Sequence, residues 1–232
     1  MDIFVSIVII TKNQKHYIEQ SLRAIQGQSY KNYEIIIVDS GSTDGARELY
    51  RRYPDVQVVS IPAVSPSEFN YIHALNQGVQ AAKGEIIAKL SGDAIPADPY
   101  WLDSLIKPFY KKSTAAVYSN YLLRNNASYF EKLQHFFLMG NGRKVFRDMT
   151  HIVGASWAFR KALWQQYGPA EKLKRSEESH FAWEALRHGY EVVYEPTSKI
   201  YHTHGRGSLQ DIKEFAKEVV SVTSYRLSRG KW

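Results

Sequence analysis

Short apolar runs typical of buried strands alternate with segments of helical periodicity through the first half of the chain, and this alternation constrains the fold most. The strand-like runs are VSIVII (5–10), EIIIVD (34–39), VQVVSI (56–61), EIIAKL (85–90) and AAVYSN (115–120). The segments between them, 17–25, 45–53, 69–82 and 99–110, repeat apolar residues at the 3.6-residue spacing of amphipathic helices. This order predicts an α/β fold with a mostly parallel, Rossmann-like sheet flanked by helices on both faces.

The pattern changes after residue 120. A polar and aromatic stretch from about 121 to 150 is predicted to be a mobile insertion or an acceptor-facing loop. Strands are predicted at 150–159, 190–196 and 199–204, and helices at 160–168 and 176–189. The tail is predicted to be an amphipathic helix whose apolar stripe consists of Leu209, Ile212, Phe215, Ala216, Val219 and Val220.

Composition restricts where the protein is expected to be located and which partners it is expected to bind. No apolar run approaches the roughly eighteen residues that a membrane span requires, and the N-terminus runs directly into a strand, so we expect a cytoplasmic protein. The chain has no cysteine, which leaves oxygen and imidazole as metal ligands. The net charge of +7 suits a nucleotide, a nucleic acid or acidic lipids. No nucleic-acid recognition motif accompanies the charge, and we expect no nucleic-acid partner.

Two acids follow strand-like runs of the predicted parallel sheet. Asp39 and Asp93 are therefore expected at the carboxyl edge, where open α/β sheets bind their ligands. Asp39 has two interpretations of about equal weight: it accepts a hydrogen bond from the N3–H of a uracil or thymine ring, or it only caps the turn into the next helix. The chain has neither G-x-G-x-x-G nor G-x-x-x-x-G-K-[ST], so the sequence supports neither a Rossmann dinucleotide site nor a P-loop.

The candidate metal ligands and the candidate base are acids and histidines near predicted element ends. Asp93 suits a magnesium or manganese ion that bridges a diphosphate. His202 and His204, two residues apart on a predicted strand, face the same side and offer nitrogen ligands, although most such pairs are structural. Glu177 and Glu178 open a predicted helix, where the helix dipole favours acids in any case. A general base also needs a substrate hydroxyl within hydrogen-bond reach.

Three segments together resemble family 2 glycosyltransferases of the GT-A fold, in which two abutting βαβ units bind a nucleotide sugar. They are the opening 5–46, SGDAIPADPYWLDSL at 91–105, and SEESHFAWEALRHGYEVVYEP at 176–196. The resemblance covers about residues 4–205. The stretch FNYIHALNQGVQAAKGEIIAKLSGDAIPA and the late HTH are similar to the rhamnosyltransferase-like branch of the family.

The resemblance implies an inverting enzyme that moves a sugar from a UDP- or dTDP-sugar to a hydroxyl of a saccharide or lipid-linked acceptor in cell-surface polysaccharide synthesis. Asp93 matches the acid that binds Mn²⁺ or Mg²⁺, with His202 and His204 as further ligands, and Glu178 matches the catalytic base. The nucleotide site would comprise Thr11, Asn13, Asp39, Ser91 and Gly92, with Lys83 or Arg160 approaching phosphate.

The chain departs from the family pattern at two positions. Ser91 stands where the first acid of Asp-x-Asp is usual, and Glu178 stands where the late motif commonly has aspartate. The main rival is therefore a degenerate nucleotide-sugar-binding or scaffold protein without transfer activity.

The resemblance also divides the chain. We expect a GT-A domain at 1–205, with a nucleotide-sugar-binding half at 1–120 and an acceptor-side half at 121–205, followed by a helical tail at 206–232. The tail either packs on the domain or on a second copy in a homodimer, which we favour, or lies on the anionic inner face of a membrane as a peripheral contact.

Overall fold

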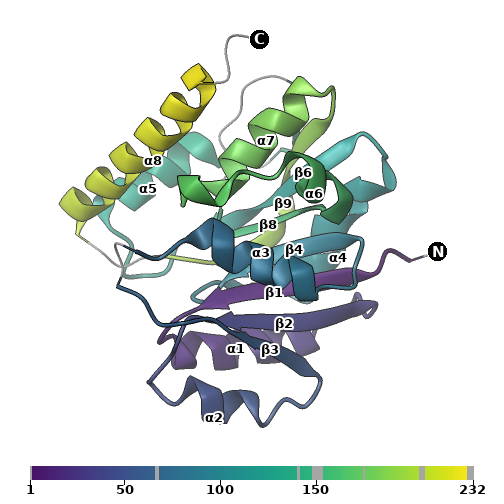
Figure 1. Cartoon of the computed structure of the whole chain (residues 1–232), viewed down its shortest axis with the longest axis vertical. Helices are drawn as coiled ribbons and strands as arrows, with labels where there is room; N and C mark the ends of the chain where they lie inside the picture. The colour runs from purple at the N-terminus through teal and green to yellow at the C-terminus, as the bar shows by residue number, and fades with distance from the viewer. Residues whose placement is uncertain are drawn as a thin grey trace.

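The computed structural model describes residues 2–65, 68–139, 142–147, 154–174, 176–203 and 207–228. Its described strands form one mixed sheet of nine, in the order β3-β2-β1-β4-β8-β6-β9-β5, with β7 paired to β9. Helices flank this sheet (Figure 1). The predicted α/β class with flanking helices is confirmed.

The first half of the chain forms the parallel part of the sheet. Its strands are β1 (Val5–Thr11), β2 (Tyr33–Asp39), β3 (Val56–Ser60) and β4 (Ile86–Ser91), in the order β3-β2-β1-β4. Its helices are α1 (Lys15–Gln26), α2 (Ala46–Tyr50) and α3 (Tyr71–Ala81). α1 buries Ile18, Leu22 and Ile25 at intervals of four and three, which is the spacing that predicted it.

The second half adds strands of both directions. β5 (Ile95–Pro96), β6 (Thr114–Leu122), β7 (Lys144–Phe146), β8 (Ser156–Arg160) and β9 (Glu191–Tyr201) belong to the sheet. The helices are α4 (Trp101–Ile106), α5 (Tyr129–Leu138), α6 (Lys161–Tyr167), α7 (Glu177–Arg187) and α8 (Ser208–Ser228), with 3₁₀ turns η1 (Lys107–Tyr110) and η2 (Glu171–Leu173). β8 runs antiparallel to both β4 and β6, while β6 and β9 are parallel to each other.

The predicted loop at 121–150 is wrong in part, because it contains α5 and β7. α5 begins with a capping box, in which Ser128 accepts a hydrogen bond from the Glu131 backbone and Glu131 reaches back to the Ser128 backbone. The two strands predicted at 190–196 and 199–204 are one strand, β9, with a register shift opposite Ser119 and Asn120. His204 lies outside the described residues.

An aromatic cluster holds α7 against the sheet. Trp157 and Phe159 on β8 pack with Trp164 of α6 and Phe181 of α7, with ring centroids 4.5 to 6.0 Å apart. Large aromatic side chains supply much apolar burial and fix the geometry of what they contact. The cluster therefore fixes the first turn of α7, with Glu177 and Glu178, beside the strands.

Candidate active site

The carboxyl ends of three parallel strands meet at one level. The register places Thr11 opposite Asp39, and Ile10 opposite Ser91. Gly92 follows directly, and its N–H donates to the Ile10 carbonyl at 2.9 Å. A Cβ on Gly92 would lie 2.6 Å from Thr11 Oγ1, closer than real side chains come. Only glycine therefore lets the 91–93 segment approach β1 this closely.

Asn13 joins the loops that follow β1 and β2. Its N–H donates to Ser42 Oγ at 2.9 Å, and its Oδ1 accepts from the Thr43 N–H at 2.8 Å. Its φ of 53° is left-handed, a conformation that asparagine tolerates better than most residues. A hollow of about 380 Å³ adjoins this joint and is lined in part by Asn13, Tyr17 and Asp44.

Asp39 is fully buried, and its carboxylate caps the turn that follows β2. Its Oδ1 accepts from the Ser42 N–H at 2.8 Å, and its Oδ2 accepts from the Tyr50 hydroxyl at 2.8 Å. Burial and then the bond to Asp39 raise the pKa of Tyr50. The segment after β3 packs closely here, because a Cβ on Gly41 would lie 2.5 Å from Ala63 Cβ. Pairing with a nucleobase stays a prediction that requires this segment to shift.

Asp93 and His202 converge at the same edge. Asp93 Oδ1 lies 3.4 Å from His202 Nδ1, and both side chains are largely buried. Two neighbouring ligands of one octahedral ion, each about 2.1 Å from the metal, lie about 3 Å apart. The pair therefore fits a divalent ion. Within the described ranges no cluster of three or more metal-binding side chains occurs, so diphosphate oxygens and water would have to complete the coordination.

Arg124 is a cation at this edge that no motif in the sequence indicates. Its Nη2 donates to the Asp93 carbonyl at 2.5 Å and to the Tyr201 carbonyl at 3.3 Å. The guanidinium carbon lies 4.5 Å from the ring centroid of Tyr17. Arg124 follows β6 in the stretch predicted as a loop, and nothing in LLRNN distinguishes it from a surface arginine.

The acid pair at the start of α7 is buried, with Glu177 4% and Glu178 8% exposed. Ser176, just before the pair, has a left-handed φ of 58°. Strained backbone of this kind clusters at functional sites. Gly154 lies against Glu178, since a Cβ on Gly154 would be 2.8 Å from Glu178 Oε2.

A buried lysine connects the acid pair to the 91–93 segment. Lys89 Nζ donates to the Gly154 carbonyl at 2.6 Å and to Ser91 Oγ at 3.2 Å, and lies 3.7 Å from Glu177 Oε1. A chain of contacts thus links the end of β4 to the candidate base, in the order Ser91, Lys89, Gly154 and Glu178. The sequence does carry a signal for Lys89, because it is a charge inside the apolar run IIAKL.

The two expected phosphate contacts lie away from this edge. The Lys83 backbone N–H donates to Glu34 Oε1 at 2.6 Å, before the start of β4 and so at the opposite edge of the sheet. Arg160 ends the antiparallel strand β8 and donates to carbonyls of Phe109, Lys111 and Thr114. Because β8 runs antiparallel to β4, its end also lies far from Asp93. Neither residue is placed to contact phosphate at the candidate site.

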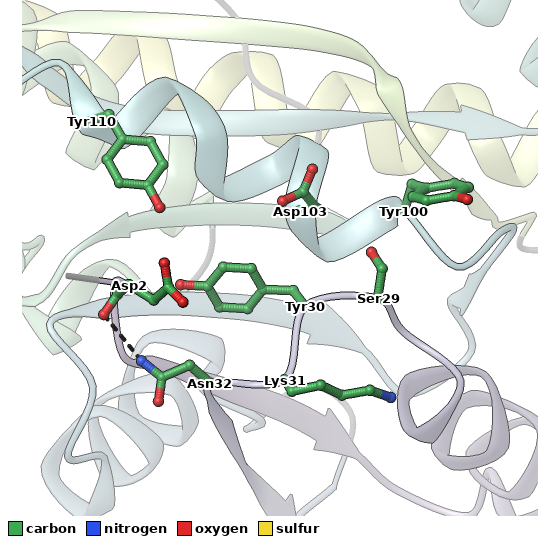
Figure 2. Close-up of a pocket in the computed structure, with 8 residues that line it drawn as sticks. All are labelled: Asp2, Ser29, Tyr30, Lys31, Asn32, Tyr100, Asp103 and Tyr110. Carbon is green, nitrogen blue, oxygen red and sulfur yellow. Dashed lines mark hydrogen bonds between the residues drawn. The ribbon is translucent and has the colours of Figure 1, made fainter.

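That opposite edge carries an open hollow of about 790 Å³ between the 29–32 loop and the α4–η1 segment (Figure 2). Tyr30, Tyr100, Asp2 and Asp103 are among its lining residues. Burial, then the neighbouring Tyr110 and acids, raises the pKa of Tyr30 to about 12. The hollow contains none of the predicted site residues.

Known proteins resemble this chain in sequence. It is 25% identical over 203 residues to the O-antigen chain rhamnosyltransferase WbaN of Salmonella anatum, and the match covers 83% of this chain and 63% of that protein. An uncharacterized glycosyltransferase of Haemophilus influenzae is 27% identical over 122 residues, 51% of this chain and 36% of the relative. The chain thus spans between about a third and two thirds of the length of these relatives.

Solved structures share the fold. A mannosyltransferase of Pyrobaculum calidifontis, PcManGT, in complex with GDP-Man and Mn²⁺, matches with a TM-score of 0.76 at 21% identity, over 100% of this chain and 66% of that one. Residues 1–349 of S. aureus TarS in complex with UDP-GlcNAc match with a TM-score of 0.63 at 18% identity, over 86% and 58%. These likenesses show the GT-A fold.

The family assignment rests on a continuous match. Residues 6–168 match the family described as glycosyl transferase family 2. This segment includes β1 to β4, the 91–93 segment and Gly154, and it is more than half of the 232 residues. The chain therefore belongs to glycosyl transferase family 2.

Proposed function

We propose that this chain is an inverting glycosyltransferase that moves a sugar from a UDP- or dTDP-sugar to a hydroxyl of a saccharide or lipid-linked acceptor. The observation that carries the proposal is the contact chain from Ser91 through Lys89 and Gly154 to the buried Glu178. It joins an edge suited to a nucleotide with a carboxylate suited to deprotonate a hydroxyl. The WbaN relative supports rhamnose as the sugar and cell-surface polysaccharide as the product.

Glu178 is the general base in this account. Its carboxylate takes the proton of the acceptor hydroxyl as the hydroxyl oxygen attacks the anomeric carbon from the face opposite the nucleotide. The bond from that carbon to the diphosphate oxygen breaks, and its electron pair leaves with the nucleoside diphosphate. The low exposure of Glu178 limits competition by water for the proton and the sugar.

Asp93 and His202 are the proposed ligands of Mn²⁺ or Mg²⁺, with His204 as a third ligand outside the described residues. The ion, when bound, neutralises charge on the leaving diphosphate. Thr11, Asn13, Asp39, Ser91 and Gly92 form the proposed nucleotide side of the site. Residues 1–120 would hold the donor, and 121–205 would face the acceptor.

Arg124 is proposed to share in neutralising the diphosphate. The protein has one acid fewer at this edge than an Asp-x-Asp site, because Ser91 replaces the first, and Arg124 adds a cation next to Asp93. Both changes make the edge more favourable for an anion even before a metal binds.

The Arg124→Met variant is expected to bind UDP or dTDP about 10- to 100-fold more weakly, because hydrogen bonds to charged groups contribute roughly 1.5–3 kcal/mol. Binding of uridine or thymidine, which lack phosphate, is expected to stay unchanged. Calorimetric titration measures both, with Arg51→Met, an exposed arginine, as the control. If the variant bound the nucleoside and the nucleotide more weakly by the same factor, Arg124 would only stabilise the loop between β6 and α5.

The function itself is tested by release of nucleoside diphosphate from UDP-, dTDP- and GDP-sugars in the presence of saccharide and lipid-linked acceptors. We expect acceptor-dependent release of UDP or dTDP. The degenerate-scaffold alternative is favoured by Ser91, which leaves a single acid in the 91–93 segment. Nucleotide binding without release from any donor would support that alternative and contradict the proposal.

A further inference from the structure

α5 presents its apolar side to the outside. Tyr129, Phe136 and Phe137 are 80%, 74% and 71% exposed, and Leu133 is 46% exposed. Intervals of three and four residues place these side chains on one side of the helix. A helix at the surface of a globular protein normally buries such a stripe. α5 therefore offers an apolar surface to something outside the described chain.

α8, the helix next to α5, also has an exposed apolar stripe. The predicted stripe of this helix is exposed at Leu209 (68%), Val220 (64%), Ile212 (45%) and Val219 (45%). Another side of the helix makes the contacts with the domain, for example Tyr225, whose hydroxyl donates to Glu184 Oε1 of α7 at 2.8 Å. The predicted packing of the tail on the domain is thus found. Of the predicted stripe, Phe215 takes part in it through Phe130 of α5, while the four residues named above stay exposed.

The two stripes belong to neighbouring helices. Ser128 Oγ donates to Asp211 Oδ2 at 2.6 Å, and the rings of Phe130 and Phe215 are 5.9 Å apart. The helices lie side by side at one corner of the molecule (Figure 1). The α5–α8 face is defined here as the exposed apolar residues Tyr129, Leu133, Phe136, Phe137, Leu209, Ile212, Val219, Val220 and Leu227. An exposed apolar surface made of this many large side chains marks an interaction site.

We propose that the α5–α8 face lies, as a peripheral contact, on the surface of a membrane that contains anionic lipids. The charge beside the face is complementary to such lipids, because Lys132 and Lys213 are exposed next to the apolar side chains and the chain carries a net charge of +7. Aromatic and aliphatic side chains on one face with lysines beside them are the signature of helices that lie in the membrane interface. Among the described residues, every helix is too short or too polar to span a bilayer.

The α5–α8 face lies close to the candidate active site. The loop that leads into α5 carries Arg124, which is hydrogen-bonded to Asp93. Tyr121, at the end of β6, contacts His135 of α5 and His202, with ring centroids 5.1 and 6.5 Å apart. A membrane on the α5–α8 face would therefore lie beside the candidate site, where an acceptor anchored in that membrane can present its hydroxyl.

The test is co-sedimentation of the full chain, without donor, with vesicles of phosphatidylcholine alone and with phosphatidylglycerol added. We expect binding to the anionic vesicles only. The double variant Phe136→Ser/Phe137→Ser is expected to reduce this binding at least about tenfold, since it removes two large apolar side chains from the surface that the lipid would cover. The control Val58→Ser/Tyr71→Ser, which removes exposed apolar side chains elsewhere, is expected to bind as the wild type does.

A second copy of the chain is the competing occupant of this face. Light scattering without lipid, over a range of protein concentrations, detects it. Two results would overturn the membrane proposal. The first is a wild type that binds no vesicles and forms a dimer, which the Phe136→Ser/Phe137→Ser variant abolishes. The second is a monomeric wild type that binds neither kind of vesicle. Vesicle binding needs no sugar donor, so its failure is distinguishable from failure of the proposed transfer activity.

Discussion

The Glu178→Gln variant is expected to lose about two to four orders of magnitude in the rate of sugar transfer, the usual range when a general base is removed. The Kd for UDP or dTDP is expected to stay at the wild-type value. The reason is that glutamine keeps the shape of the side chain beside Gly154 but cannot take a proton from the acceptor. Release of nucleoside diphosphate in the presence of acceptor measures the rate, and calorimetry measures the Kd.

Two further variants make this result interpretable. Glu178→Asp has the residue that the late motif of the family commonly carries, and it is expected to keep a substantial part of the activity. Glu48→Gln removes an exposed acid on α2 and is expected to change nothing. Wild-type transfer by Glu178→Gln would remove Glu178 from the role of base.

The Lys89→Met variant is expected to lose about 3–5 kcal/mol of folding stability, the usual cost of breaking a buried ion pair by removing one partner. Lys89 and Glu177 have side-chain exposures of 6% and 5%, and their Nζ and Oε1 atoms are 3.7 Å apart. Without the ammonium group, Glu177 is left as a buried charge with less compensation. Unfolding in urea measures the loss.

A double-mutant cycle separates this effect from ordinary loss of packing. Lys89→Met/Glu177→Leu is expected to be more stable than Lys89→Met alone, because both charges are then absent. The control Lys83→Met replaces an exposed lysine that precedes β4 and is expected to be neutral. Additive losses in the cycle would show that Lys89 and Glu177 do not interact.

The parallel half of the fold follows from local sequence. β1, β2 and β4 are short runs of mainly buried residues, mostly β-branched in β1 and β2, and the amphipathic segments between the strands fix the alternation with helices. Carboxyl ends of parallel strands share an edge, which is why the order of these elements along the chain is enough to place Asp39 and the 91–93 segment together.

The second half depends on contacts between distant segments. Nothing local in 156–160 states that β8 inserts antiparallel between β4 and β6. α5 escapes prediction although Ser128 and Glu131 form a readable capping box, because its apolar residues face outward and its polar flanks resemble a loop. Lys89 is visible as a charge in an apolar run, but its partners Gly154 and Glu177 lie far along the chain.

The proposed transfer depends first on whether the carboxyl edge binds a nucleoside diphosphate through a metal held by Asp93. Calorimetric titration of UDP and dTDP into the wild type and into Asp93→Asn, each with Mn²⁺ and with a chelator, answers this. We predict that one of the two nucleotides binds the wild type more tightly with Mn²⁺, and that Asp93→Asn loses this gain. The same Kd for both proteins, with and without metal, would contradict the assignment of Asp93.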